Sequence, residues 1–384
     1  MRSKQNYFLL CIITFLGLLF SGCIQSPDVR RTSSMHIARS GHTSISLENG
    51  KVMILGGRGY DTAQVELYNP ETEKFELSPT LLFSKKNKEY RSLTATPLAN
   101  GQILILGNNI GKLFDPTSEA FSNSKIKLKN LYFFDQKAIP LNKNEFLVWG
   151  TKYVPYGIKR RSKEDQIWYE LQSEIINITT GQSRSINVNN TKSVCHSFYL
   201  LPSGKIFTAG QPLPFNKNEK SWAEILVPET NSRIPVEIPF SACEVLGILK
   251  NGELLVHKSD QSAYRYDSKS NTLLKIKGAT SPMYPIGTTV INLSDGKAII
   301  IGGTSKQASP NNLNIEIYNP KTNTFTTGPS IAPFRIEFHA TLLKNNQLLI
   351  TGGWVQHQTW LGEYRMKDFN NADLLDLNQI LTKY

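Results

Sequence analysis

Short apolar segments recur along the chain, and each follows a turn that contains Gly or Asn. LENGKVMILGG (47–57), LANGQILILGN (98–108), LSDGKAIIIGG (293–303) and LKNNQLLITGG (343–353) share this pattern. Asn-Gly and Asp-Gly between apolar runs are typical of tight β-hairpins, because Gly adopts the positive φ that such turns need. The pattern therefore predicts pairs of antiparallel strands.

A less apolar segment precedes each of these turns, and the pair of segments recurs roughly every 50 residues. In units three and seven, Asn144 and Asn346 stand at the turn position, where Asn is the next best residue for positive φ. The predicted first strands are HTSISL (42–47), SLTATPL (92–98), KAIPL (137–141), HSFYLL (196–201), VLGIL (245–249), TTVINL (288–293) and HATLL (339–343). Internal repeats of this kind indicate a repeat architecture.

A second kind of turn follows a third strand in each unit. Asn-Pro and Asp-Pro before Thr or Ser initiate turns, because proline fixes φ and the Asn or Asp side chain bonds back to the backbone. The copies are VELYNPETEKFEL (65–77), LFDPTSEAF (113–121), AEILVPETNSRI (223–234), AYRYDSKSNTLL (263–274) and IEIYNPKTNTFT (315–326), with more divergent ones at 173–186 and 362–375. Four short antiparallel strands per unit predict an all-β propeller of seven four-stranded blades. Rings of six or eight blades are the alternatives, whereas two separate domains would leave sheet edges exposed.

Several side chains recur at fixed places in these units. An arginine precedes the first strand, a glycine pair ends the second, and a Phe stands on the fourth. The residues are Arg39 and Arg335, Gly56-Gly57, Gly302-Gly303 and Gly352-Gly353, and Phe75, Phe121 and Phe325. The pattern resembles the kelch repeat of bacterial propeller lipoproteins and the galactose-oxidase-like superfamily. The resemblance implies a kelch-type β-propeller over residues 36–384.

The N-terminal residues predict where in the cell the protein is located. Residues 1–22 have the pattern of a secretory signal peptide, with an apolar run too short for a comfortable membrane span. The run ends in Leu19-Phe20-Ser21-Gly22-Cys23, which resembles the lipobox of bacterial lipoproteins, so we expect lipidation of Cys23, membrane attachment and a place in the cell envelope. Ile24 stands where inner-membrane lipoproteins tend to carry Asp, which favours the outer membrane if the cell has one. Ordinary cleavage nearby is the alternative, and residues 23–35 are expected to form the lipid anchor and a polar tether.

One face of the predicted propeller carries the longest loops. Loops between second and third strands and between blades share that face, and the variable segments 151–170, 211–222, 304–313 and 354–362 fall there. Aromatic and basic side chains together suit a protein hot spot or a stacked sugar. The predicted binding residues are Tyr153, Tyr156, Arg160, Arg161, Trp168, Trp222, Trp354 and Trp360. The alternative is that the tryptophans pack the loops down and the charges are solvated.

Catalysis is a second hypothesis. Some envelope propellers that the repeats resemble interconvert sialic-acid anomers through acid and base residues at the channel mouth, where we expect Arg39, Arg335 and Glu337. Strand-three glutamates favour a structural role for the arginines, because a buried charge needs a partner. These glutamates are Glu66, Glu174, Glu224, Glu316 and Glu363.

The spacing also predicts residues that line the central channel. They stand nine positions before the first turn, at Gly41, Ser92, Asp135, Cys195, Cys243, Gly287 and Glu337. Cys195 and Cys243 fall at one register on neighbouring strands, and they could form a disulfide if their Cα atoms lie within about 7 Å. Two free thiols are the alternative. The six histidines show no spacing typical of a metal site, so neither metal nor cofactor is expected.

The chain carries a formal net charge of +12, but no block of like charges is long enough for a nucleic-acid-binding arm. Nucleic acid is therefore not expected as a partner. The sequence predicts a lipid-anchored scaffold that binds a protein or a glycan through its long-loop face. The alternative is a carbohydrate-active enzyme of the epimerase or mutarotase kind.

Overall fold

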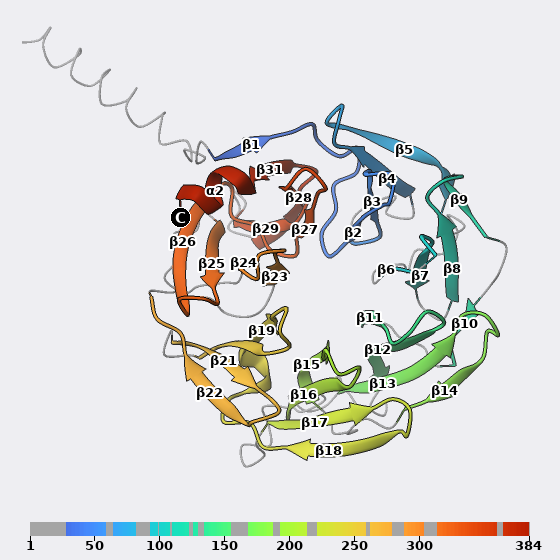
Figure 1. Cartoon of the computed structure of the whole chain (residues 1–384). Coiled ribbons are helices and arrows are strands. Elements are labelled where there is room, and N and C mark those ends of the chain that lie inside the picture. The colour runs from blue at the N-terminus through green and yellow to red at the C-terminus, as the bar shows by residue number, and fades with distance from the viewer. Residues whose placement is uncertain are drawn as a thin grey trace, which may run out of the picture.

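The computed structural model describes most of the chain after the N-terminal segment. The described ranges are 28–58, 64–81, 93–98, 100–107, 110–122, 126–129, 134–154, 168–186, 193–212, 221–258, 262–278, 288–302, 313–358 and 364–383. They form seven antiparallel sheets arranged as blades around a central axis (Figure 1). The predicted all-β propeller with seven four-stranded blades is confirmed.

Blades one to three follow the chain order from the innermost strand outward. Blade one contains β2 (Thr43–Ser46), β3 (Val52–Leu55), β4 (Gln64–Asn69) and β5 (Lys74–Leu81). Blade two contains β6 (Leu93–Pro97), β7 (Ile103–Gly107) and β8 (Ile110–Asp115), with β9 (Ala120–Phe121) and β10 (Ile126–Lys127) both paired to β8. Blade three contains β11 (Phe134–Pro140), β12 (Glu145–Val154), β13 (Trp168–Asn177) and β14 (Ser183–Ser185).

Blades four to six repeat the same order. Blade four contains β15 (Ser193–Leu200), β16 (Ile206–Pro212), β17 (Trp222–Val227) and β18 (Ser232–Val236). The 3-10 helix η1 (Ala242–Glu244) leads into blade five, with β19 (Val245–Ile248), β20 (Leu254–His257), β21 (Ala263–Asp267) and β22 (Thr272–Lys275). Blade six contains β23 (Thr289–Asn292), β24 (Ala298–Ile301), β25 (Leu313–Asn319) and β26 (Thr324–Ile331).

Blade seven is built from both ends of the chain. Its strands are β27 (His339–Leu342), β28 (Gln347–Thr351), β31 (Ala372–Asp376) and β1 (Val29–Arg31). The N-terminal β1 pairs with β31 in the register Val29 to Leu375 and closes the ring. The predicted tether over 23–35 is therefore wrong for residues 29–31. These residues form the outermost strand of their sheet, and such a strand can be polar.

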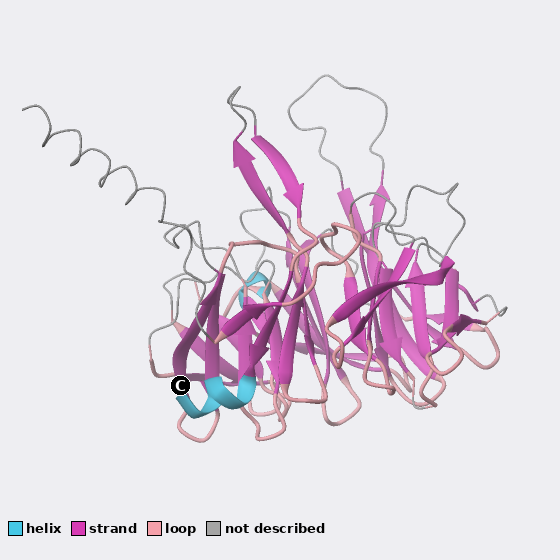
Figure 2. Ribbon diagram, turned by 90° about the horizontal axis from the view of Figure 1, so that it is seen from above, coloured by secondary structure: helices cyan, strands magenta, loops and turns pink. Residues whose placement is uncertain are grey.

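The prediction for the third strand of blade seven is also wrong, because this strand is β31. Most of the predicted copy at 362–375 lies outside blade seven, because β29 (Trp354–Gln358) and β30 (Tyr364–Asp368) form a hairpin of their own. Figure 2 shows this hairpin and the ends of β12 and β13 rising from the same side of the ring. The helix α2 (Leu377–Lys383) lies on the opposite side, with Leu377 and Ile380 buried. No helix in the described part of the chain has the length and apolar character to span a membrane.

The second strand of each blade has a buried, mainly apolar centre because it faces two neighbouring blades. In β3, Val52 and Ile54 join a buried cluster with blade seven, whereas Met53 and Leu55 join a cluster with blade two. Side chains alternate between the faces of a strand, so each face contributes to a different interblade core. Such clusters fill all seven junctions between blades. The repeated apolar segment of the sequence is therefore the central layer of the fold.

The turns follow the predicted chemistry, with one exception. Gly50 has a φ of 86° and Asn346 a φ of 61° in the first type of turn. In the second type, the Asn69 Oδ1 atom accepts the Glu71 N–H at 2.9 Å, and the same bond recurs in other blades. In blade three, Asn142 rather than Asn144 organises the turn, because its Oδ1 atom accepts two backbone N–H groups.

A chain that begins at residue 36 should be less stable than one that begins at residue 28. The shorter chain loses the buried Val29 and Met35 and leaves β31 as a free edge. It also removes Arg31, whose Nε atom lies 2.8 Å from the buried Asp373 carboxylate. We expect a loss of about 3–5 kcal/mol, measured by urea unfolding. Arg30→Ser, at an exposed ion pair, serves as the control and should change stability by less than about 1 kcal/mol. Equal stability of the two chains would show that residues 28–35 are only a tether.

Candidate functional site

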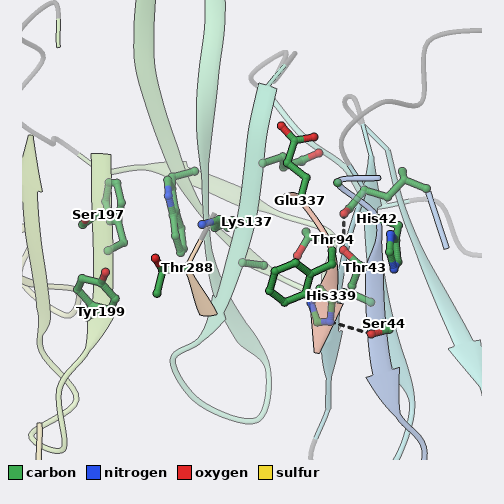
Figure 3. A pocket seen from close by; sticks show the side chains of 18 of the residues that line it. His42, Thr43, Ser44, Thr94, Lys137, Ser197, Tyr199, Thr288, Glu337 and His339 are labelled. Carbon is green, nitrogen blue, oxygen red and sulfur yellow. Dashed lines mark hydrogen bonds between the residues drawn. The ribbon is translucent and has the colours of Figure 1, made fainter. Parts of the chain in front are cut away.

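A cavity of about 740 Å³ lies on the axis of the ring. All seven blades contribute to its wall through residues on or just before their innermost strands, and Trp149 of β12 also lines it. The polar side chains that line it are His42, Thr43, Ser44, Thr94, Gln136, Lys137, Ser197, Tyr199, Thr288, Glu337 and His339. Figure 3 shows most of them pointing toward a common space. A concave, polar space of this size is large enough for a small molecule.

A hydrogen-bonded network joins blades seven and one at the wall of this cavity. The His339 Nδ1 atom lies 2.7 Å from the Ser44 Oγ atom, and the Ser44 hydroxyl also contacts the Thr341 hydroxyl. Deeper in the wall, the His42 Nε2 atom lies 2.8 Å from the Thr351 Oγ1 atom. Through this network, side chains from the first and last blades hold the junction closed.

Burial keeps the two histidines neutral. Loss of solvent and, to a smaller extent, the positive charge of Lys137 together lower the pKa of His339 to about 4. Burial likewise holds the pKa of His42 well below its ordinary value, helped by His339 and the nearby arginines. Burial raises the pKa of Tyr199 to about 12, so its phenol stays protonated. At neutral pH these side chains therefore offer uncharged hydrogen-bonding groups.

The arginines at the predicted channel mouth lie in the interior instead. Arg39 is fully buried, and its guanidinium lies 3.0 Å from the Glu66 carboxylate and donates to two backbone carbonyls. Arg335 is also fully buried and pairs with Asp373 at 2.5 Å. Neither arginine is among the described residues that line the cavity. The predicted structural pairing of arginine with a strand-three acid is confirmed, and both arginines are held away from any ligand in the cavity.

The acid of strand three occupies one register in five blades. It stands opposite Ile54, Val148, Thr208, Ile300 and Ile350 of the second strands, and the acids are Glu66, Glu174, Glu224, Glu316 and Asp373. Each of them is buried. Asp373 thus takes the position that we assigned to Glu363, which lies outside the described residues. The shorter carboxylate and the inserted hairpin hid this equivalence in the sequence.

Glu337 is the predicted site residue that the structure does bring to the cavity. It lies at the cavity rim with φ of 54°, and its carboxylate forms an ion pair with Arg58. The Arg58 guanidinium also lies 5.3 Å from the centre of the Trp354 ring and 3.9 Å from the Met366 sulfur. A cation thus links the cavity rim to the base of the β29–β30 hairpin. Residue spacing gave no signal for Arg58 or Lys137, since neither belongs to a recurring motif.

The base of the β29–β30 hairpin is fixed to blades one and seven. The Ser40 hydroxyl donates to the Asp368 carboxylate at 2.5 Å, and the backbones of Ile336 and Trp354 exchange two hydrogen bonds. Beyond this base, Met366 is 60% exposed and lies between the exposed Arg365 and Lys367. The hairpin therefore presents a basic, partly apolar strand from a rigid support.

The other predicted binding residues have different fates. Trp222 packs beside Gly210, where an added Cβ atom would lie 2.5 Å from the indole, and it contacts the core between blades three and four. The backbones of Tyr153 and Trp168 belong to the paired strands β12 and β13. Their side chains lie outside the described residues. So do residues Tyr156, Arg160, Arg161, Trp360 and the proposed lipidation site Cys23.

The two cysteines do not share the predicted strand register. Cys195 lies on β15, whereas Cys243 lies on η1, which leads into β19. Their side chains lie outside the described residues, so the disulfide stays a prediction. Among the residues that the structure describes, no group of three or more His, Cys, Asp or Glu side chains is placed to hold a metal ion.

Comparison with known proteins adds no family assignment. No protein-family model matches the chain, and no curated protein matches it. The fold and the site geometry therefore carry the functional argument.

Arg39→Met should destabilise the protein by about 3–5 kcal/mol, because it leaves the buried Glu66 carboxylate without its cation. The double variant Arg39→Met/Glu66→Gln should recover a large part of this loss. Gln removes the charge and keeps an oxygen for the backbone N–H of His36 or Ile37. The free energies are compared by urea unfolding at pH 7. A double variant less stable than Arg39→Met would contradict the charge explanation.

Stability should fall as the pH drops from about 6.5 to about 4, because the unfolded chain binds a proton at His339 that the folded protein resists. Above pH 6.5 this histidine is neutral in both states and costs nothing. Its contribution to the loss at pH 4 should be about 2 kcal/mol, discounted for partial solvent access. His339→Asn should flatten the slope of unfolding free energy against pH between 4 and 6.5. An unchanged slope would assign the acid sensitivity to other groups.

Proposed function

We propose that the protein is a binding scaffold of the bacterial cell envelope, anchored by lipid on Cys23, which holds a protein or glycan partner on its long-loop face. One observation carries this proposal: the β29–β30 hairpin and the extended β12–β13 pair rise from the ring on the side of the cavity rim (Figure 2). Propellers commonly serve as rigid supports for such projections.

The repeats support a kelch-type propeller as the framework. The paired glycines after the second strands of blades one and seven have positive φ, and their backbone approaches the neighbouring segment closely. A Cβ atom on Gly57 would lie 2.6 Å from the Ser40 carbonyl oxygen, and one on Gly353 would lie 2.9 Å from that of Ile336. Close aromatic pairs between strands three and four, such as Tyr68 with Phe75 at 4.8 Å, agree with the same assignment.

The position of the chain's N-terminal end supports an outward-facing binding surface. The strand β1 runs antiparallel to β31, which ends at α2, so β1 begins on the α2 side of the ring. The Lys383 ammonium lies 2.9 Å from the Asp28 carboxylate there. Cys23 precedes Asp28 by five residues, a length that spans at most about 18 Å. A lipid on Cys23 would hold the α2 side close to the membrane and turn the hairpins away from it.

The chemistry of the projecting strand suits an acidic partner with an apolar patch. Arg365 and Lys367 supply exposed positive charge, and Met366 supplies an adaptable apolar contact. The aromatic side chains predicted for the neighbouring loops would add stacking area. Binding at this face does not require the buried arginines, which hold the blades together.

Shortening the β12–β13 projection tests the proposal. Val154 and Trp168 are directly paired, so replacing residues 155–167 by Asn-Gly closes the ladder with a two-residue turn. The full chain, tagged at its C-terminus, is crosslinked in intact cells. We expect capture of the specific partner to fall about tenfold or more in the shortened variant. Glu337→Ala should leave capture unchanged.

A charge-matched pair of variants controls for nonspecific attraction. Arg365→Ser/Lys367→Ser removes two positive charges from the hairpin face, and Lys205→Ser/Lys321→Ser removes two from turns on the α2 face. The first pair should weaken capture and the second should not. Two variants decide the outcome: the one with the shortened β12–β13 projection, and Arg365→Ser/Lys367→Ser. If both have the thermal stability of the wild type and capture the partner as well as the wild type does, the proposal is overturned.

A further inference from the structure

The cavity on the axis contains a positive charge that has no role in the proposed binding at the long-loop face. Lys137 lies on β11, the innermost strand of blade three, and is exposed within the cavity wall. Figure 3 shows it between Ser197, Tyr199 and Thr288 on one side and His339 with Ser44 on the other. Lys137 and His339 both line this cavity.

The described wall offers little negative charge to balance this lysine. Of the described residues that line the cavity, Glu337 alone is acidic, and its carboxylate is bound by Arg58 at the rim. His42 and His339 are held neutral by burial. The described wall below the rim therefore carries a net positive charge in a confined space, where charge interactions are stronger than in bulk water.

Uncharged hydrogen-bonding groups surround the lysine. Thr94, Ser197, Tyr199 and Thr288 line the same cavity and are each partly accessible to solvent. Hydroxyl groups donate to anionic oxygens, and the high pKa of Tyr199 preserves its proton for such a bond. A lysine with several hydroxyl donors from different blades is a suitable set for an oxyanion with polar substituents.

We propose that the axial cavity binds a small organic anion, with its carboxylate or phosphate at Lys137 and its hydroxyl groups among the surrounding Ser, Thr and Tyr side chains. The volume of about 740 Å³ admits such a molecule together with water. Entry is from the rim that Glu337 and Arg58 form. Lys137 lies inside the ring, below the rim from which the hairpins rise, and different variants test binding in the cavity and binding at the hairpins.

Titration with three matched compounds tests the site. Glycerate, glycerol 3-phosphate and neutral glycerol share a carbon skeleton, and binding to the full chain after signal removal is measured by calorimetry at constant chloride concentration. At least one of the two anions should bind, and glycerol should not. The stronger anion identifies the preferred group. Lys137→Gln should weaken binding about tenfold or more, and Lys137→Arg should retain most of it.

Two further variants make the result specific. Lys205→Gln removes an equal charge from an exposed turn on the opposite face and should leave anion binding unchanged. Asp135→Asn tests an acid two residues before Lys137, whose side chain lies outside the described residues, and binding should not depend on its removal. Three outcomes would each overturn the proposal. They are no anion binding by the wild type, a loss of binding in Lys205→Gln as large as that in Lys137→Gln, and binding that appears only with Asp135→Asn. The variant with the shortened β12–β13 projection should still bind the anion, which separates this test from that of the proposed function.

Discussion

The fold depends on one constraint: the second strand of every blade is buried on both faces. Val52 and Ile54 pack toward blade seven while Met53 and Leu55 pack toward blade two, and the same division recurs around the ring. A blade therefore has no core of its own, since its apolar side chains are covered only when both neighbours are present. The need to cover both faces fixes the ring and leaves the outer strands and loops free to vary.

Buried carboxylates of the third strand add a polar connection to this apolar framework. Glu66 binds the backbone N–H groups of His36 and Ile37 as well as Arg39, so one acid holds the segment that enters blade one. In blade seven, Asp373 joins Arg335 and Arg31, which come from the entering segment and from the closing strand. These pairs locate the first strands, and with them the side chains that line the axial cavity.

The sequence predicted what repeats, and it failed where the repeat is interrupted. The blades, their turns and the pairing of Arg39 with Glu66 follow from patterns that occur several times along the chain. The sequence does not identify β31 as the third strand of blade seven. The β29–β30 hairpin, which precedes β31 in the chain, has the same alternation of side chains as a blade strand. Lys137 and Arg58 belong to no repeated pattern of the sequence. Their roles depend on His339 and Glu337, which lie more than 150 residues away in the chain. Only the folded ring brings these partners together.

The pairing of β1 with β31 has a consequence for the order in which the molecule is completed. The strand β1 is synthesised before all the blade strands that follow it, and its partner β31 stands near the C-terminus. In blades one to six each sheet is made from consecutive segments of the chain, so its strands can pair as soon as they are synthesised, and their apolar faces are covered as the next blade follows. Blade seven has to wait for the C-terminus. A chain cut short before β31 would thus leave its own N-terminal strand unpaired, so a defect at one end of the chain also opens the structure at the other end.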